Sequence, residues 1–258
     1  MNSTLVKLMG WKAHVLEGDP SLYDQWKWLR KHLQPGPLRT LEIDCRTGCF
    51  SLYAATLGNE VFGIDADPDN IRAAKSQARL LGTNTTQFFR SDATTLLELA
   101  RKKGFAPYDQ ILCLDATPHL EGQKDWVTRL AELLRPGGKL FMTAAYKYTK
   151  PLYGTTGNTP TPSETEETRR GFTHEELARR FKDAGIHLTE QEYLSGLVTQ
   201  SLTNATRAMS RANATFAWSL VLPLRLLQIM DSPVTRFARY PHLQLAVVGV
   251  KPRPKDSH

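Results

Sequence analysis

The chain has 258 residues, a hydrophobic fraction of 41% and a formal net charge of +7 at pH 7. That length is enough for one large domain with a well-buried core, and the charged fraction of 23% is ordinary for a soluble globular protein. The basic residues are scattered rather than gathered with aromatic ones. We therefore expect no nucleic-acid partner.

Three cysteines, Cys45, Cys49 and Cys113, suit a reducing compartment and provide no disulfide framework. They lack the paired spacing of metal ligands, so we expect buried packing residues and no metal site. The N-terminus has no apolar core of the signal-peptide type. The most apolar window, residues 216–230, is too short to span a bilayer. We therefore expect a cytoplasmic protein without a transmembrane segment.

Strand-like and helix-like stretches alternate along the first half of the chain. A Trp-rich region, residues 1–37, is expected to be helical and to precede them. The expected order is then strand 38–43, helix 50–57, strand 60–64, helix 68–81, strand 86–90, strand 110–114, helix 126–134 and strand 139–144. Such alternation predicts a parallel sheet with helices on both faces.

The second half begins with residues 146–170, which are rich in Thr, Pro and Gly and are expected to form a lid loop. Thr173 and Glu176 then form a capping-box pattern that starts a helix ending at Gly185. A strand at 186–193, a mainly helical segment at 197–230 and a final strand at 243–250 complete the chain. The predicted fold class is α/β, a Rossmann-like seven-stranded, mostly parallel sheet with a helical cap insertion. Residues 1–258 are expected to form a single domain, with a core at 38–145 and a C-terminal half at 171–258.

Residues 41–48 read Leu-Glu-Ile-Asp-Cys-Arg-Thr-Gly, a buried strand that runs into a tight turn before a helix. Nucleotide-type cofactors bind at such turns, and the usual pattern is acid-x-Gly-x-Gly-x-Gly. Glu42 supplies the acid and Gly48 the last glycine, whereas Asp44 and Arg46 occupy the first two glycine positions. Either the loop has been retuned around a cofactor or it no longer binds one.

Four further motifs follow in order. They are Asp65 with Ala66 after the second strand, Asp92-Ala93 after the third, the fourth-strand segment 108–115 ending in Asp115, and the Leu-Leu-Arg-Pro-Gly-Gly-Lys-Leu segment 133–140. With the segment 170–177, this order resembles the class I S-adenosylmethionine-dependent methyltransferases, most closely the type 11-like small-molecule branch. The resemblance covers the chain from about residue 38 onward and implies S-adenosylmethionine as cofactor.

The resemblance also implies roles for these residues. Asp65 would bind the ribose hydroxyls, because a carboxylate accepts two hydrogen bonds at once. Asp92 and Ala93 would contact the adenine, and Asp115 would lie beside the methionine part of the cofactor. Glu42, Asp44, Arg46, Gly48 and Ala66 complete the predicted cofactor-binding set.

His119 is the best candidate for a general base, since histidine titrates near neutral pH and this one follows the fourth strand. An equal alternative is that His119 caps or packs the next helix. The family often has Glu-His here, whereas this chain has Pro118-His119, which removes a possible acidic partner. Tyr146 and Tyr148, after the fifth strand, are candidates for lining the acceptor pocket or for packing.

Asp44 and Arg46 leave three readings open. The Arg46 guanidinium pairs with the cofactor's carboxylate or with Asp44, or it points to solvent while backbone contacts survive, or it blocks the site. Glu42, Asp65 and Asp92 remain suitable for binding, which favours a retuned, functional pocket.

The sequence thus predicts an enzyme that transfers a methyl group from S-adenosylmethionine to an oxygen or nitrogen of a small or medium-sized, fairly apolar metabolite, in a biosynthetic role. The segment 197–230 would cap the acceptor site, although an apolar surface for a membrane or a homodimer would look similar. Two alternatives are a non-methylating enzyme that uses the cofactor electrostatically in a cyclisation or elimination, and a cofactor-independent interaction protein.

Overall fold

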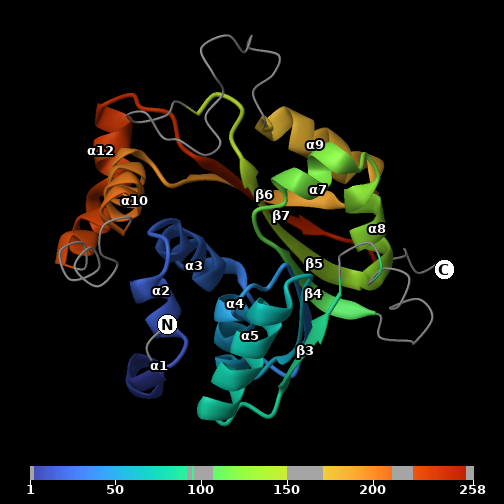
Figure 1. Cartoon of the computed structure of the whole chain (residues 1–258). Helices are drawn as coiled ribbons and strands as arrows, with labels where there is room; N and C mark the ends of the chain where they lie inside the picture. Colours follow the sequence, from blue (N-terminus) through green and yellow to red (C-terminus); the bar gives the residue numbers. More distant parts are fainter. Residues whose placement is uncertain (1–2, 92–94, 96–106, 150–170, 211–222, 254–258) are drawn as a thin grey trace.

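A computed structural model describes residues 3–91, 95, 107–149, 171–210 and 223–253. A seven-stranded sheet in the order β3-β2-β1-β4-β5-β7-β6 forms its centre (Figure 1). The strands are β1 (Arg39–Ile43), β2 (Glu60–Asp65), β3 (Thr86–Arg90), β4 (Tyr108–Cys113), β5 (Leu134–Ala145), β6 (His187–Leu194) and β7 (Gln244–Val250). Strands β1 to β5 pair in parallel, and β7 is antiparallel to both of its neighbours. The predicted fold class is confirmed, apart from the role of the cap.

Helices cover both faces of the sheet (Figure 1). On one face lie α3 (Ser21–His32), α4 (Cys49–Thr56) and α5 (Pro68–Leu80), and on the other α7 (Thr117–Gly122), α8 (Trp126–Leu133) and α9 (His174–Asp183). Alternate strand residues supply the two cores. Leu41 and Ile43 of β1 join the α7–α9 side, whereas Leu112 of β4 and Phe141 of β5 join the α3–α5 side. The period-2 burial of the strands explains why both faces are apolar.

The start of β5 corrects the sequence prediction. Its ladder pairs Leu134 with Tyr108 and then, after an irregularity, Lys139 with Gln110. The Pro-Gly-Gly segment therefore belongs to an irregular first part of β5 instead of separating helix from strand. Gly137 has φ 81°, and its N–H donates to the Lys251 carbonyl at 2.8 Å. Glycine permits this left-handed backbone, and so the chain bends without leaving the sheet.

Helix α7 was not expected, because its six residues are too few to show a periodic pattern. Helix α9 begins with the predicted capping box: the Thr173 side chain accepts from the Glu176 N–H, and the Glu176 side chain accepts from the Thr173 N–H. Both predicted hydrogen bonds are present, which fixes the start of α9 after the segment predicted to be a lid loop. Residues 150–170 of that loop lie outside the described residues.

The segment predicted as a cap contains α10 (Leu197–Ser210) and the 3-10 helix η2 (Arg225–Met230), and a further helix, α12 (Asp231–Phe237), follows it. Residues 211–222 lie outside the described residues. Asp231 accepts hydrogen bonds from the backbone N–H groups of Gly196 and Val198 and so caps the start of α10. This buried carboxylate joins α12 to the start of α10, and η2 contacts both helices, so the three form one layer.

This helical layer packs against the N-terminal helices α2 (Lys12–Glu17) and α3 (Figure 1), whereas α1 (Ser3–Met9) contacts α2 and α5. Arg225 donates to the carbonyls of Val15 and Gly18, and Gln228 donates to the Pro20 carbonyl at 2.9 Å. The layer therefore rests on α2 and α3. No helix in the described part of the chain is long and apolar enough to cross a bilayer.

Gly63 tests the packing between β2 and β3. A Cβ there would lie 2.6 Å from Phe88 Cδ1 and 3.0 Å from Ser51 Oγ. Gly63→Ala should lower the free energy of unfolding by about 1–3 kcal/mol, because the core must shift to admit the methyl group. Urea denaturation measures this difference. Gly122→Ala is the matched control, since a Cβ there meets nothing within 4 Å; equal losses in the two variants would contradict the packing described.

Candidate active site at the carboxyl ends of β1 and β4

The candidate site lies where the strand order reverses. Strand β1 pairs with β2 on one side and with β4 on the other, and Ile43 is in register with Cys113. Because the two strands are parallel, Asp44, which follows Ile43, and Asp115, two residues after Cys113, emerge at the same edge of the sheet. Such a switch point is where ligands bind in open α/β sheets.

The loop between β1 and α4 keeps the backbone of a glycine loop without two of its glycines. Asp44 has φ 53°, Arg46 has φ 49° and Gly48 has φ 85°. All three positions are left-handed, a conformation that costs an L-residue other than glycine about 1–2 kcal/mol. The loop thus has left-handed backbone at these positions although Asp44 and Arg46 carry side chains.

Arg46 lies across the site and joins two carboxylates. Its backbone N–H donates to Asp65 Oδ2 at 2.8 Å, and its Nη2 donates to Asp115 Oδ2 at 2.9 Å. Asp115 also accepts from Gln25 Nε2 at 3.0 Å and Gln244 Nε2 at 2.9 Å. The expected alternative, a pair between Arg46 and Asp44, is wrong, because the carboxylate at the end of β4 holds the guanidinium.

Asp65, at the end of β2, is 6% exposed and accepts several hydrogen bonds. Besides the Arg46 N–H, the Asp67 N–H donates to it at 2.9 Å and Asn70 Nδ2 at 3.1 Å. These donors fix the carboxylate at the switch point. Ala66 follows, and its carbonyl accepts from Arg90 Nε at 3.3 Å.

Glu42 is buried inside β1 beneath the loop, and the Ser51 hydroxyl donates to it. Burial raises the pKa of the Glu42 carboxyl from 4.5 to about 8, an effect that the hydrogen bonds from Ser51 and the charge of Arg46 only partly offset. Glu42 is therefore mainly protonated at neutral pH. A neutral carboxyl can both donate and accept a hydrogen bond.

His119 contacts the site through Asp44 of the loop between β1 and α4. Its Nε2 lies 2.5 Å from Asp44 Oδ2, and its ring stacks on Trp126 with centroids 4.5 Å apart and planes 16° apart. Pro118 provides no acidic partner for His119, as predicted. Asp44, which occupies the first glycine position of the loop, provides the carboxylate from a distant part of the sequence.

A cavity of about 50 Å³ opens between the loop, β4 and the N-terminal helices. Its lining includes Glu42, Asp44, Arg46 and Asp115, with Gln25 from α3. Gln25 Oε1 is buried and has no hydrogen-bond partner among the described residues. An acceptor without a donor is costly in a protein interior, so this atom is suited to a ligand's N–H or O–H group.

The N-terminal helices close one side of the cavity. His14 of α2 is buried, and its Nδ1 lies 3.1 Å from Thr47 Oγ1 of the loop. Burial lowers the pKa of His14 to about 4, which leaves the ring neutral near pH 7.

Tyr146 lies beyond the end of β5 in an aromatic cluster. Its ring meets Tyr148 at 5.6 Å and Tyr193 at 5.2 Å, both edge-on, and Tyr193 stacks with His174 and His242. Tyr148 and Tyr193 are exposed. The structure therefore places Tyr146 in an aromatic cluster at the carboxyl end of the sheet and shows no bond from it to the loop.

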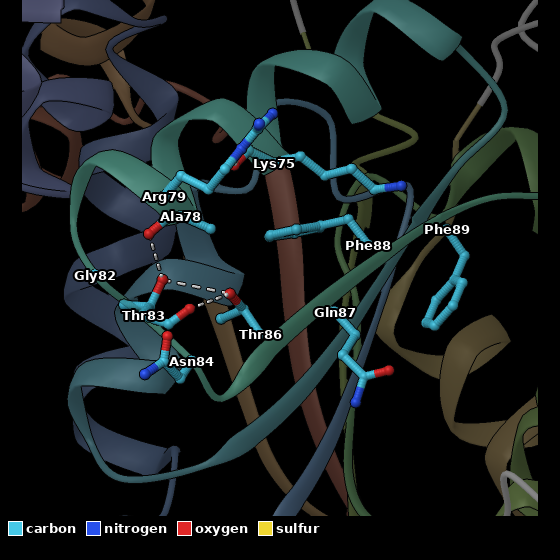
Figure 2. A pocket seen from close by; sticks show the side chains of 10 residues that line it. All are labelled: Lys75, Ala78, Arg79, Gly82, Thr83, Asn84, Thr86, Gln87, Phe88 and Phe89. Atoms are coloured by element: carbon cyan, nitrogen blue, oxygen red, sulfur yellow. Dashed lines mark hydrogen bonds between the residues drawn. The ribbon is translucent and has the colours of Figure 1, made fainter.

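A larger groove, of about 660 Å³, lies between α5 and β3 (Figure 2). Lys75 and Arg79 extend along it from α5, and Phe88 packs between it and the loop, since a Cβ at Gly48 would touch the Phe88 ring at 3.0 Å. The groove's lining contains neither a carboxylate nor a histidine. The carboxylates therefore line the smaller cavity at the switch point and not this groove.

The structure brings together Glu42, Asp44, Arg46, Gly48, Asp65 and Asp115, with His119 at their edge. Asp92 and Ala93 lie outside the described residues. Sequence reasoning missed Gln25 and Gln244, which are 219 residues apart and give no motif. Only the folding of α3 and β7 onto the same edge of the sheet joins them.

Comparisons with known proteins point to the methyltransferases. A family profile described as "Methyltransferase domain" matches residues 41–140. The ubiquinone biosynthesis O-methyltransferase of Xanthomonas axonopodis pv. citri is 25% identical over 210 residues, covering 76% of this chain and 81% of that protein. The protein of that name from Cereibacter sphaeroides is 36% identical over 101 residues, covering 39% of this chain and 38% of that protein.

Solved structures share the fold. The methyltransferase from Aquifex aeolicus has a TM-score of 0.55 at 12% identity, covering 97% of this chain and 99% of that one. The cyclase SpnF has a TM-score of 0.60 at 17% identity, covering 91% and 82%. The fold is that of the class I methyltransferases. The domain match at residues 41–140 and the shared fold support a class I methyltransferase with S-adenosylmethionine as its cofactor. Its assignment to the type 11-like branch stays a prediction.

Arg46→Gly removes the side chain and keeps a residue that accepts φ 49°. We expect the variant to fold and to bind S-adenosylhomocysteine about 10- to 150-fold more weakly, because a charged hydrogen bond of about 1.5–3 kcal/mol is lost. Isothermal titration calorimetry measures the affinity. Arg129→Ala, which removes an exposed pair with Asp125, is the control. Unchanged affinity in Arg46→Gly would mean that the guanidinium does not contact the cofactor.

Glu42→Gln tests the raised pKa. The unfolded carboxyl ionises near pH 4.5, whereas the folded one stays protonated up to about pH 8. The free energy of unfolding should therefore fall as the pH rises between these values, with the loss complete above about pH 8. Glutamine cannot ionise, so the variant should gain stability relative to wild type from about pH 5 to about pH 8 in urea denaturation. Asp24, whose pKa burial raises to about 6, is common to both proteins and cancels. A pH-independent difference would contradict the raised pKa.

Proposed function

We propose that this methyltransferase acts on an oxygen or nitrogen atom of a small or medium-sized, fairly apolar metabolite. The observation that carries the proposal is the arrangement at the switch point, where Arg46 bridges Asp65 and Asp115 beside the Asp44–His119 pair. Relatives named O-methyltransferases support oxygen as the acceptor atom.

The residues present fit the cofactor. Asp65 is suited to ribose hydroxyls because an ionised carboxylate only accepts hydrogen bonds. Arg46 is suited to the carboxylate of the methionine part, and Asp115 with the unpartnered Gln25 Oε1 to its ammonium group. Gly48 leaves the backbone room that a Cβ would take, since that Cβ would contact Phe88 and Ala74.

The remaining assignments rest on the resemblance. We propose Ala66 beside the ribose, Asp92 and Ala93 at the adenine, and Glu42 as a neutral support for the loop. Tyr146 would line the acceptor side, and the α10–η2–α12 layer would cap it. That layer exposes Leu226, Leu227, Ile229 and Phe237, and a homodimer through this apolar surface stays a prediction.

S-adenosylmethionine supplies a methyl group already activated on a sulfonium, so the protein's task is to align donor and acceptor and to exclude water. Asp65, Asp115 and Arg46 bind and orient. An acceptor hydroxyl must lose a proton as its oxygen is methylated, and we propose that His119 accepts it. The short bond to Asp44 and the stack on Trp126 hold the His119 ring for that step.

The test combines binding with product analysis. We expect S-adenosylmethionine and its demethylated product to bind in calorimetry. In a panel of phenols, catechols and secondary amines, at least one compound should yield methylated product and S-adenosylhomocysteine in equal amounts. Asp65→Asn is the matched variant: it keeps the size of the side chain, removes the carboxylate, and should bind the cofactor more weakly.

Two results would overturn the proposal. If neither S-adenosylmethionine nor its demethylated product bound, a working cofactor site would be excluded. Product that forms while the cofactor stays intact would instead indicate electrostatic use of the cofactor in a cyclisation or elimination.

A further inference from the structure

Asp44 combines an unfavourable backbone with a specific side-chain contact. Its φ of 53° suits glycine, the residue usual at this position of the loop. Asp tolerates the left-handed region better than most residues, although at a cost. The Asp44 carboxylate reaches Nε2 of His119, 75 positions away, at 2.5 Å. The side chain therefore contributes something that glycine at this position would not.

His119 is held from several sides. Trp126, fully buried, stacks on the ring, and the His119 carbonyl accepts from the Gln123 N–H at 2.9 Å. Helix α7 is fastened to β5 at its first residue, because the Ala145 N–H donates to Thr117 Oγ1 at 2.7 Å. The ring thus has a fixed position, and the bond to Asp44 determines its orientation.

The bond to Asp44 also determines where the ring carries its proton. An ionised carboxylate only accepts, so Nε2 must be the protonated nitrogen. Nδ1 then keeps its lone pair, and no described residue bonds to it. A histidine in this state is ready to accept a proton at Nδ1, and the carboxylate stabilises the imidazolium that results.

We propose that Asp44 is the positioning residue of His119. It fixes the Nε2–H tautomer and the ring orientation, so that Nδ1 accepts the proton of the acceptor hydroxyl. This inference rests on the proposed function and deepens it, since it gives the altered loop a task on the acceptor side of the site. Within the loop, Arg46 would serve the cofactor and Asp44 the base.

The first experiment needs no acceptor. In the whole 258-residue chain labelled with 15N-histidine, His119→Gln identifies the His119 signals by their loss. We expect a downfield Nε2 proton on His119 that exchanges slowly with water. In Asp44→Asn the group that accepts the hydrogen bond from His119 is neutral, so the signal of this proton should move upfield or disappear. Absence of the proton in wild type, or an unchanged shift in Asp44→Asn, would overturn the proposal.

The second experiment uses an acceptor found in the panel. Asp44→Asn should lower kcat about 100-fold, within the range for general-base catalysis, while calorimetric affinity for S-adenosylhomocysteine changes less than about twofold. In the His119→Gln background the same substitution should have no further effect on kcat, because Asp44 acts through His119. An equal loss in both backgrounds, or a large loss of cofactor affinity, would assign Asp44 to the cofactor instead.

Asp125→Asn is the control, since Asp125 pairs with Arg129 on the surface and should leave kcat unchanged. The two proposals fail separately. If no compound is methylated by wild type, the proposed function fails while the nuclear magnetic resonance result still decides whether Asp44 holds His119.

Discussion

The parallel pairing of β1 with β4 is the constraint on which the site depends. It places the residues after the two strands at one edge of the sheet, at the point where the strand order reverses. Asp44 and Asp115 therefore emerge together, and β2 brings Asp65 to the same edge. The bonds of Arg46 to Asp65 and Asp115, and of His119 to Asp44, follow from this placement.

The loop after β1 shows how charged residues replace glycines without loss of a turn. Three left-handed residues keep the backbone path, although two of them carry side chains. The conformational cost of about 1–2 kcal/mol at each is of the same order as one hydrogen bond to a charged group. Asp44 and Arg46 each make such a bond, to His119 and Asp115 respectively. The contacts thus offset strain that an alanine at either position would leave uncompensated.

Much of the fold was predictable because its signals are local. The periodic apolar residues, Gly48 and the capping box at Thr173 each depend on a few neighbouring residues. The partners of Arg46 and His119 were not predictable, because the sequence offered several carboxylates and only the sheet order chooses among them. Gln25 and Gln244 carried no signal at all, since an amide becomes informative only when burial leaves it facing a carboxylate. The irregular start of β5 escaped prediction because Pro-Gly-Gly is usual in turns and is rarely part of a ladder.

The central claim is that Asp44 and Arg46 retune the cofactor site and do not disable it. A crystal structure of the chain with S-adenosylhomocysteine tests it most directly. We predict that the Arg46 guanidinium leaves Asp115 for the cofactor's carboxylate, while the Asp44–His119 bond and the left-handed backbone of the loop persist. An Arg46–Asp115 pair that stays intact, with the methionine part excluded from the cavity beside Gln25, would contradict the claim.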